Sequence, residues 1–216
     1  MQYISHCESP LGKLLLSADD LGLTGIWFEG QKYFAHSLKE PFEEKEVPVI
    51  KETKRWLTIY FSRKEPDFTV PLHFLGTDFQ KMVWEILCSI PYGKTMTYGE
   101  IARQIAFQKG IPHMSAQAVG GAVGHNKISI LVPCHRVVGT NGSLTGYAGG
   151  MDKKVKLLTL EGVDCHASNY SSHLRQLYRR LNPTSPLYHL SQRAVFYGTF
   201  LSALLTIPIL SHIVFS

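Results

Sequence analysis

The run Pro133-Cys134-His135-Arg136-Val137 places a nucleophile beside a base and a cation. A cysteine attacks as its thiolate, and with an ordinary pKa of about 8.5 only a few per cent of the thiol is ionised at neutral pH. A nearby base or cation must therefore assist, and His135 and Arg136 follow directly. The run predicts a nucleophilic cysteine, although a structural cysteine beside a structural histidine would give the same dipeptide.

The apolar segment 128–132 that precedes this run is expected to form a short strand ending at Pro133. Adjacent side chains of a strand point to opposite faces, so His135 would not touch Cys134 directly. A bridging water or a sharp turn is needed to connect the two groups. A glycine-rich loop is expected over 139–150.

Helices are predicted on both sides of the cysteine in the sequence. Capping boxes at Thr77–Gln80 and Thr97–Glu100 begin two of them, which run to about residues 90 and 106. Ser115 caps a third helix over 116–124, and the second and third are expected to form a helix-turn-helix-like unit. A fourth helix over 152–160 ends at Glu161, with Gly162 as its stop.

The third of these helices is unusually rich in small residues, namely Ala118, Gly120, Gly121, Ala122 and Gly124. Each glycine costs a helix up to about 1 kcal/mol relative to alanine, so something must compensate. Tight packing against another helix and close approach to a nucleic acid are equally good explanations from composition alone.

The N-terminal part is expected to contain an antiparallel meander of strands over 3–6, 13–18 and 23–28. A charged loop over 39–48 follows, and then a helix whose apolar side chains include Ile50, Leu57 and Tyr60. Residues 68–72 are expected to add another strand. A domain boundary is expected near Gly76.

Composition excludes few functions. The chain has 216 residues, 44% of them hydrophobic and 18% charged, which argues against wholesale disorder. A net charge of +5 permits an anionic partner such as nucleic acid without requiring one. The start of the sequence lacks a secretory signal pattern, so a reducing cytoplasm and free thiols are expected. Cys88 is expected to be a packed thiol, and Cys7 has no recognised metal-ligand spacing.

The order of these features resembles the O6-alkylguanine-DNA alkyltransferase family, the methylated-DNA–protein-cysteine methyltransferases. The resemblance is strong from Thr77 to Gly162 and loose before it, and it rests on the Pro-Cys-His-Arg-Val run after a Gly-Gly-Ala-Val-Gly helix. It implies an α/β (α+β) fold with two domains. Residues 1–75 would form a ribonuclease H-like antiparallel sheet with a helix, and residues 76–165 a mostly helical, winged-helix-like DNA-binding domain.

The resemblance also implies roles for individual residues. Cys134 would accept the alkyl group permanently, so that each molecule acts once and without a cofactor or metal. His135 would take the thiol proton through a water, and Glu161 would orient His135. Asn126 would tie the helix-turn-helix to the active-site segment, and Tyr98 would crowd the target phosphate and help to protonate the departing guanine.

The implied partner is double-stranded DNA that carries O6-alkylguanine or O4-alkylthymine, bound through its minor groove by a monomer without an obligate protein partner. The target base must leave the stack, because its O6 atom is buried in the duplex. Substrate and DNA contacts are implied for Gln117, Ala118, Gly120, Gly121, Arg136, Val137, Tyr147, Gly149 and Lys154.

The sequence departs from the family pattern at a few positions. Many members carry an arginine where Gln117 stands, and that arginine fills the space left by the flipped base. We therefore expect slower base flipping or weaker DNA binding, with activity retained. Ala148 stands where a serine hydrogen-bonds the guanine in other members, which bears on substrate range.

Two other functions fit part of the pattern. A non-reacting module that only recognises alkylated bases would lack the cysteine, which is present here as Cys134. A cysteine hydrolase could use Cys134, His135 and Glu161, but it would need repeated turnover and an oxyanion hole, and a helix-turn-helix would not serve it.

The tail over 166–216 has no counterpart in the resemblance. Its last part, 194–216, has no formal charge with His212 neutral and is long enough to be a membrane-anchor candidate, although Pro208 interrupts it. A translated non-native extension, for instance from a shifted reading frame, is the other interpretation of this segment. We expect an appended, non-catalytic and disordered tail, and a cytoplasmic, nucleoid-associated protein.

Overall fold

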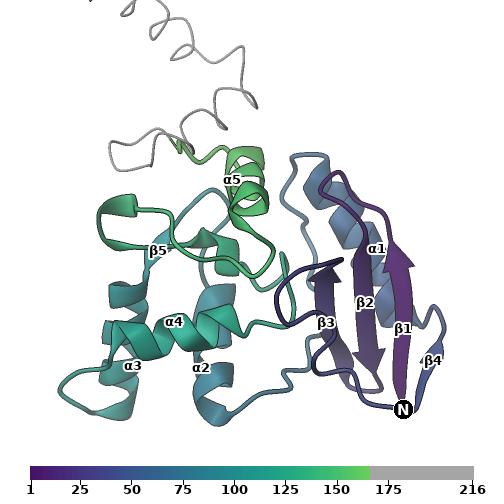
Figure 1. Ribbon diagram of the computed structural model, residues 1–216, viewed down its shortest axis with the longest axis horizontal. Helices are drawn as coiled ribbons and strands as arrows, with labels where there is room; N and C mark the ends of the chain where they lie inside the picture. Colours follow the sequence, from purple (N-terminus) through teal and green to yellow (C-terminus); the bar gives the residue numbers. More distant parts are fainter. Residues whose placement is uncertain (166–216) are drawn as a thin grey trace, which may run out of the picture.

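The computed structural model describes residues 1–165, so the predicted tail and its anchor-like segment lie outside the described residues. Figure 1 shows a β-sheet at one side and a group of helices at the other, with α5 (Met151–Leu160) above the junction. No helix within residues 1–165 is long and apolar enough to cross a membrane.

The N-terminal meander is confirmed. Strands β1 (Gln2–Cys7), β2 (Leu14–Asp19) and β3 (Gly22–Phe28) pair antiparallel in sequence order. The residues of β3 are all buried, because α1 (Pro48–Phe61) and the C-terminal part both pack near it. Helix α1 buries the predicted apolar face, including Leu57 and Tyr60.

Two predictions in this part were wrong. The predicted loop over 39–48 contains a short strand, β4 (Phe42–Glu44), which pairs parallel with β1 and gives the sheet order β3-β2-β1-β4. All three β4 residues are exposed, so no hydrophobic alternation marks the strand. The predicted strand over 68–72 forms only one isolated bridge, Leu23 to Leu72, because Pro71 has no N–H to donate to a ladder.

The helices of the C-terminal part follow the predicted signals. Both capping boxes are formed at the starts of α2 (Asp78–Cys88) and α3 (Tyr98–Lys109), and Ser115 caps α4 (Ala116–Gly124). Helix α3 runs three residues past the predicted end at Ala106. It stops where Gly110 takes the left-handed conformation, φ 63°, which glycine adopts without strain.

The predicted strand over 128–132 is the largest correction. The segment makes one isolated bridge, Ile26 to Ile128, and then turns, with Ile130 at φ 72°. It leads into a 3-10 turn (Cys134–Arg136) and a two-residue strand, β6 (Val137–Val138), that pairs parallel with β5 (Met96–Thr97). An apolar composition fits a buried strand as well as a buried turn. Hydrogen bonds from the Asn126 side chain to the backbone of Ile128 and Val132 hold this segment in a turn.

Candidate active site

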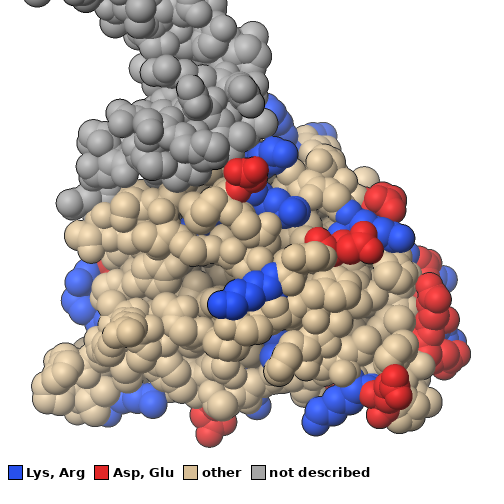
Figure 2. Space-filling model, viewed as in Figure 1, with Lys and Arg blue, Asp and Glu red and all other residues tan. Residues whose placement is uncertain are grey.

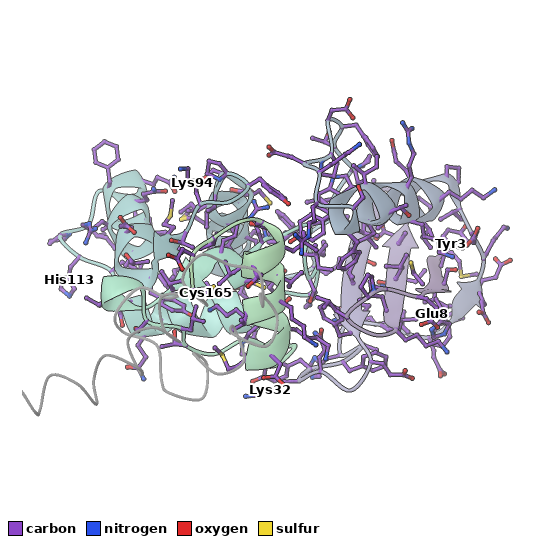
Figure 3. All side chains as sticks on the ribbon, turned by 90° about the horizontal axis from the view of Figure 1, so that it is seen from above. Tyr3, Glu8, Lys32, Lys94, His113 and Cys165 are labelled. Carbon is purple, nitrogen blue, oxygen red and sulfur yellow. The ribbon has the colours of Figure 1, made fainter. Side chains whose placement is uncertain are left out.

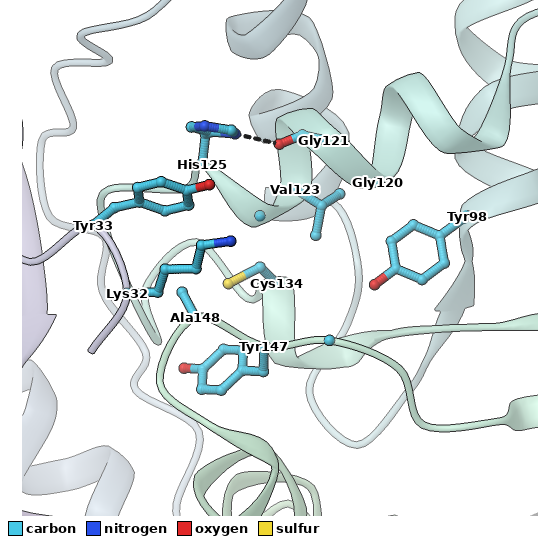
Figure 4. A pocket seen from close by; sticks show the side chains of 12 residues that line it. Lys32, Tyr33, Tyr98, Gly120, Gly121, Val123, His125, Cys134, Tyr147 and Ala148 are labelled. Atoms are coloured by element: carbon cyan, nitrogen blue, oxygen red, sulfur yellow. Dashed lines mark hydrogen bonds between the residues drawn. The ribbon is translucent and has the colours of Figure 1, made fainter. Parts of the chain in front are cut away.

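Cys134 lines a cavity of about 300 Å³ between the sheet part and the helical part of the chain (Figure 4). Cys134 is only 5% exposed, so its thiol is largely shielded from bulk solvent. The size is at the lower end of ligand pockets, about 300–1,000 Å³. The lining residues come from the loop after β3, from α3 and α4, and from the glycine-rich loop: Lys32, Tyr33, Tyr98, Gly120, Gly121, Val123, Gly124, His125, Cys134, Gly146, Tyr147 and Ala148.

Asn126 holds the turn that presents Cys134. Its Oδ1 accepts a hydrogen bond from the Ile128 amide at 3.0 Å, and its Nδ2 lies 2.9 Å from the Val132 carbonyl oxygen. The same Nδ2 lies 3.0 Å from Cys134 Sγ. Asn126 therefore ties the turn together and also offers the sulfur a donor, which favours the thiolate.

His135 is fully buried, and its Nε2 lies 2.7 Å from Glu161 Oε1. Because a carboxylate only accepts, Nε2 carries the hydrogen and Nδ1 is the basic nitrogen of the neutral ring. Nδ1 is buried and has no hydrogen-bond partner among residues 1–165. The 3-10 turn over 134–136 also removes the alternation of side chains expected of a strand.

The Glu161 carboxylate accepts hydrogen bonds on both oxygens. Oε1 accepts hydrogen bonds from His135 Nε2, from the Tyr60 hydroxyl at 2.6 Å and from Arg136 Nη2 at 3.0 Å. Oε2 accepts hydrogen bonds from Arg136 Nε at 2.9 Å and from the Gly93 amide at 3.2 Å. Burial opposes ionisation, but hydrogen bonds and charges from His135 and Arg136 outweigh it and lower the pKa of Glu161 to about 2. The group is therefore a carboxylate throughout the neutral range.

Arg136 lies inside the protein, which differs from the DNA or substrate contact implied by the resemblance. It is 8% exposed, and besides Glu161 it donates from Nη1 to the Ile90 carbonyl oxygen at 2.6 Å. A carboxylate without exposed surface needs a compensating charge, and Arg136 supplies it. Arg136 does not line the cavity that contains Cys134.

The reacting groups are both neutral at rest. Burial raises the pKa of the Cys134 thiol, and the opposing effects of Asn126 and Lys154 do not overcome it. Burial likewise lowers the pKa of His135, although Glu161 acts in the other direction. The thiol therefore keeps its proton until a base removes it, and His135 is available to do so.

Lys154 anchors the glycine-rich loop and does not line the cavity. It is fully buried, and its Nζ donates to the carbonyl oxygens of Val137 at 2.5 Å and Thr145 at 2.7 Å. Burial lowers the pKa of Lys154 to about 8. The Val137 side chain is also buried, and the contact with substrate that the resemblance implied for this residue stays a prediction.

The glycine-rich loop brings Tyr147 into the cavity wall. Burial raises the pKa of Tyr147 well above its usual value, so it remains a neutral phenol. Gly149 does not line the cavity. A Cβ at Gly149 would lie 2.7 Å from the Tyr147 ring, which explains why a glycine allows the loop to fold over this ring.

Helix α4 presents a different surface. Gly120 and Gly121 line the cavity, and Gln117 lines an adjoining groove together with Tyr98. Gln117 and Ala118 are exposed. Figure 2 shows few charged side chains over α4, whereas acidic side chains gather beside β1 and β4.

Sequence reasoning missed the contribution of the N-terminal part. Lys32 and Tyr33 line the cavity, and the Lys32 amide donates to the Ala148 carbonyl oxygen at 3.1 Å. The Tyr33 ring stacks on His125 at a centroid separation of 4.5 Å. Figure 3 shows Lys32 at the junction of the two parts, near α5. No pattern in the loop after β3 links these residues to Cys134, which lies about a hundred residues later.

Known proteins of one family match this chain over most of its described length. The model for the ribonuclease-like domain of 6-O-methylguanine DNA methyltransferase matches residues 2–74, and the model for its DNA binding domain matches residues 78–163. The chain belongs to the 6-O-methylguanine DNA methyltransferase family. Its expected mixed α/β fold, with an N-terminal sheet and a helical C-terminal part, is confirmed.

This chain aligns with nearly the whole length of its relatives in the 6-O-methylguanine DNA methyltransferase family. The methylated-DNA–protein-cysteine methyltransferase of Methanosarcina acetivorans is 45% identical over 161 residues, covering 74% of this chain and 98% of the relative. The crystal structure of Mycobacterium tuberculosis O6-methylguanine methyltransferase superposes with a TM-score of 0.63 at 38% identity, covering 81% and 99%. A structure of the M. tuberculosis protein with DNA gives a TM-score of 0.62 at 40% identity, covering 74% and 92%.

Proposed function

We propose that this protein repairs DNA by moving a methyl or larger alkyl group from O6-alkylguanine, and from O4-alkylthymine, to its own Cys134. The observation that carries the proposal is the thiol in the cavity wall, followed directly in the sequence by a neutral histidine. The Nδ1 atom of this histidine has no hydrogen-bond partner among residues 1–165, and its Nε2 atom is hydrogen-bonded to a buried carboxylate. This is the general arrangement of a nucleophile with an oriented base.

In the proposed reaction, the basic Nδ1 of His135 takes the thiol proton through a bridging water. The Cys134 sulfur then attacks the alkyl carbon, so that an S–C bond forms while the C–O6 bond breaks and its electron pair stays on O6. Glu161 stabilises the imidazolium that results, and Asn126 stabilises the thiolate by its hydrogen bond. The thioether cannot be reversed by these groups, so each molecule reacts once.

The departing guanine leaves as an anion and needs a proton. Tyr98 is proposed to supply it, because its hydroxyl is directed into the cavity (Figure 4). Burial raises the pKa of Tyr98, so it carries its proton under the conditions of the reaction. Tyr98 then regains a proton from solvent while His135 releases the thiol proton to solvent, so that both side chains end neutral and no net proton is gained or lost.

Helix α4 is proposed to lie in the DNA minor groove. A Cβ added at Gly121 or at Gly124 would meet nothing within 4 Å, so packing inside the protein does not account for these glycines. Both residues line the cavity that holds Cys134. Of the two explanations that composition left open, close approach of a ligand backbone is therefore favoured at these positions. The minor groove carries little sequence information, which suits repair at any sequence.

The division into a domain over 1–75 and a domain over 76–165 is also a proposal. It is supported by the separate grouping of sheet and helices (Figure 1). The cavity lies between these parts, so we propose that both domains shape the site. A cytoplasmic, nucleoid-associated location is proposed as well, because all four cysteines are free thiols.

The deciding experiment is the intact mass of the protein after exposure to duplex DNA that contains O6-methylguanine, followed by peptide mapping. We expect one added methyl group per molecule, on the peptide that contains Cys134. Product should appear as a single stoichiometric burst. Continued turnover would instead indicate a hydrolase, and an unchanged mass with bound DNA would indicate a recognition module.

Replacing Gln117 with arginine is expected to speed methyl transfer from duplex DNA by about fivefold. Gln117 is exposed on the largely uncharged α4 surface, and an arginine there can stack on bases and attract phosphates, effects worth about 1 kcal/mol or more. Single-turnover rates with duplex DNA measure the change. The rate with free O6-methylguanine base is the control and should stay the same, and an unchanged duplex rate would contradict the role of Gln117.

A further inference from the structure

Tyr60, on α1, contacts the histidine and the carboxylate that accompany Cys134. Its side chain comes from the N-terminal part, 75 residues before His135 and 101 before Glu161, and it is fully buried. The hydroxyl donates to Glu161 Oε1 at 2.6 Å and lies 3.4 Å from His135 Nε2. Tyr60 and His135 therefore meet at the same carboxylate oxygen.

The surroundings hold Tyr60 in one orientation. The Trp56 ring, one turn earlier on α1, stacks on it at 5.3 Å, and the Tyr92 and His135 rings meet it edge-on at 6.0 and 6.5 Å. Burial and the neighbouring Glu161 raise the pKa of Tyr60 well above its usual value. The hydroxyl consequently keeps its proton and remains a hydrogen-bond donor in the neutral range.

We propose that Tyr60 is a positioning residue for alkyl transfer, which fixes the Glu161 carboxylate and limits how strongly that carboxylate holds a proton on His135. The inference rests on the proposed function of Cys134 and His135. The N-terminal part of the chain would then influence the proton transfer to His135, in addition to lining the cavity with Lys32 and Tyr33.

The physical reason is competition for Oε1. This oxygen accepts from Tyr60, from His135 and from Arg136, and each donor withdraws negative charge that the others would share. A strong bond from a neutral hydroxyl therefore weakens the pull of Glu161 on the His135 imidazolium. His135 then stays neutral, and able to accept the thiol proton, down to a lower pH than it would beside an unshared carboxylate.

Other groups also face His135, and they set the background against which Tyr60 acts. They come from the 3-10 turn, from α5 and its C-terminal end and from the glycine-rich loop: Cys134, Arg136, Lys154, Glu161 and Tyr147. Tyr60 is the group from α1 that contacts the Glu161 carboxylate directly. Removing its hydroxyl alone leaves every charge in this set in place.

The test is Tyr60→Phe, which keeps the ring and removes the hydroxyl. Single-turnover methyl transfer is measured from about pH 5.5 to 9, and the His135 ring is titrated by NMR in the unreacted protein. We expect the midpoint of the acidic limb and the NMR midpoint to rise together by about one pH unit, since hydrogen bonds to charged groups contribute about that much. Transfer should slow about tenfold below the midpoint and much less at pH 9.

Tyr92→Phe is the matched control. Its hydroxyl is removed from the same neighbourhood, but it donates to the Leu160 carbonyl oxygen at 3.2 Å and not to the carboxylate. Both midpoints should stay at the wild-type values in this variant. Equal shifts in the two variants would show a general loosening of the site and would overturn the proposal.

A second substitution keeps the test decisive if Tyr60→Phe folds poorly. Site-specific 3-fluorotyrosine at position 60 retains the hydroxyl and makes it a stronger donor, so both midpoints should move down. Midpoints that stay unchanged in the Tyr60 variants, with only a lower melting temperature, would reduce Tyr60 to a structural role. Absence of methyl transfer in the wild type would contradict the proposed function, whereas the NMR titration would still decide the claim about Tyr60 and His135.

Discussion

Cys134→Ala is expected to abolish methyl transfer completely while DNA binding is retained. The thiol is the group to which the alkyl carbon is proposed to bond, and an alanine offers no atom that can accept it. The change removes one buried sulfur and leaves the Glu161 cluster untouched, so the fold should persist. Intact mass after incubation with O6-methylguanine DNA measures the transfer, and a gel-shift titration measures the binding.

Cys88→Ala is the matched control for this variant. Cys88 is a free thiol at the end of α2, and it is exposed, which differs from the packed thiol that the sequence predicted. It does not line the cavity that contains Cys134. The Cys88 variant should accept one methyl group as the wild type does. Methyl transfer that survives in the Cys134 variant and disappears in the Cys88 variant would contradict the assignment of the acceptor.

Arg136→Ala is expected to destabilise the protein by about 3–5 kcal/mol, which is the usual effect of removing one partner of a buried ion pair. Glu161 would keep its charge in a buried position while losing two of its five hydrogen bonds and the positive charge of Arg136. A melting temperature lower by about 10 °C should result. Urea unfolding monitored by circular dichroism measures the loss.

Arg103→Ala, on the exposed surface of α3, is the control, and it should change stability by less than about 0.5 kcal/mol. If Arg136 were a DNA contact, its variant would instead bind DNA more weakly at unchanged stability. That outcome would overturn the buried ion pair.

The same cluster predicts the response to acid. Because the pKa of Glu161 is lowered from its usual 4.5 to about 2 in the folded state, its contribution is fully present above about pH 4.5. The contribution is lost as the pH falls from there toward 2.

Local signals in the sequence predicted much of the fold. The two capping boxes, the helix cap at Ser115 and the meander of β1 to β3 depend on neighbouring residues, so their patterns could be interpreted without tertiary information. The nucleophile was identified from the order of motifs around Cys134, since the Cys-His dipeptide alone has a structural explanation as well. Strand β4 escaped prediction because its exposed residues carry no hydrophobic period.

Long-range contacts decided the rest. Nothing near Arg136 in the sequence distinguishes a DNA contact from a buried partner of Glu161, and the choice depends on a carboxylate 25 residues away. Segment 128–132 turns because Asn126 takes up its backbone groups, a competition that apolar composition does not reveal. Tyr60 looked like one apolar residue of a helix face, and only the packing of α1 against the helical part brings its hydroxyl to Glu161.

The sequence by itself therefore determined that Cys134 is the candidate acceptor and that His135 and Glu161 accompany it. The tertiary structure decided how they act together: a buried thiol and a buried imidazole, both neutral, beside a carboxylate kept ionised by Arg136. The physical reason is that proton affinities depend on burial and on partners distant in the chain. Residue types and spacing identify the groups, but the tertiary structure determines the burial and the charged neighbours that control proton transfer between them.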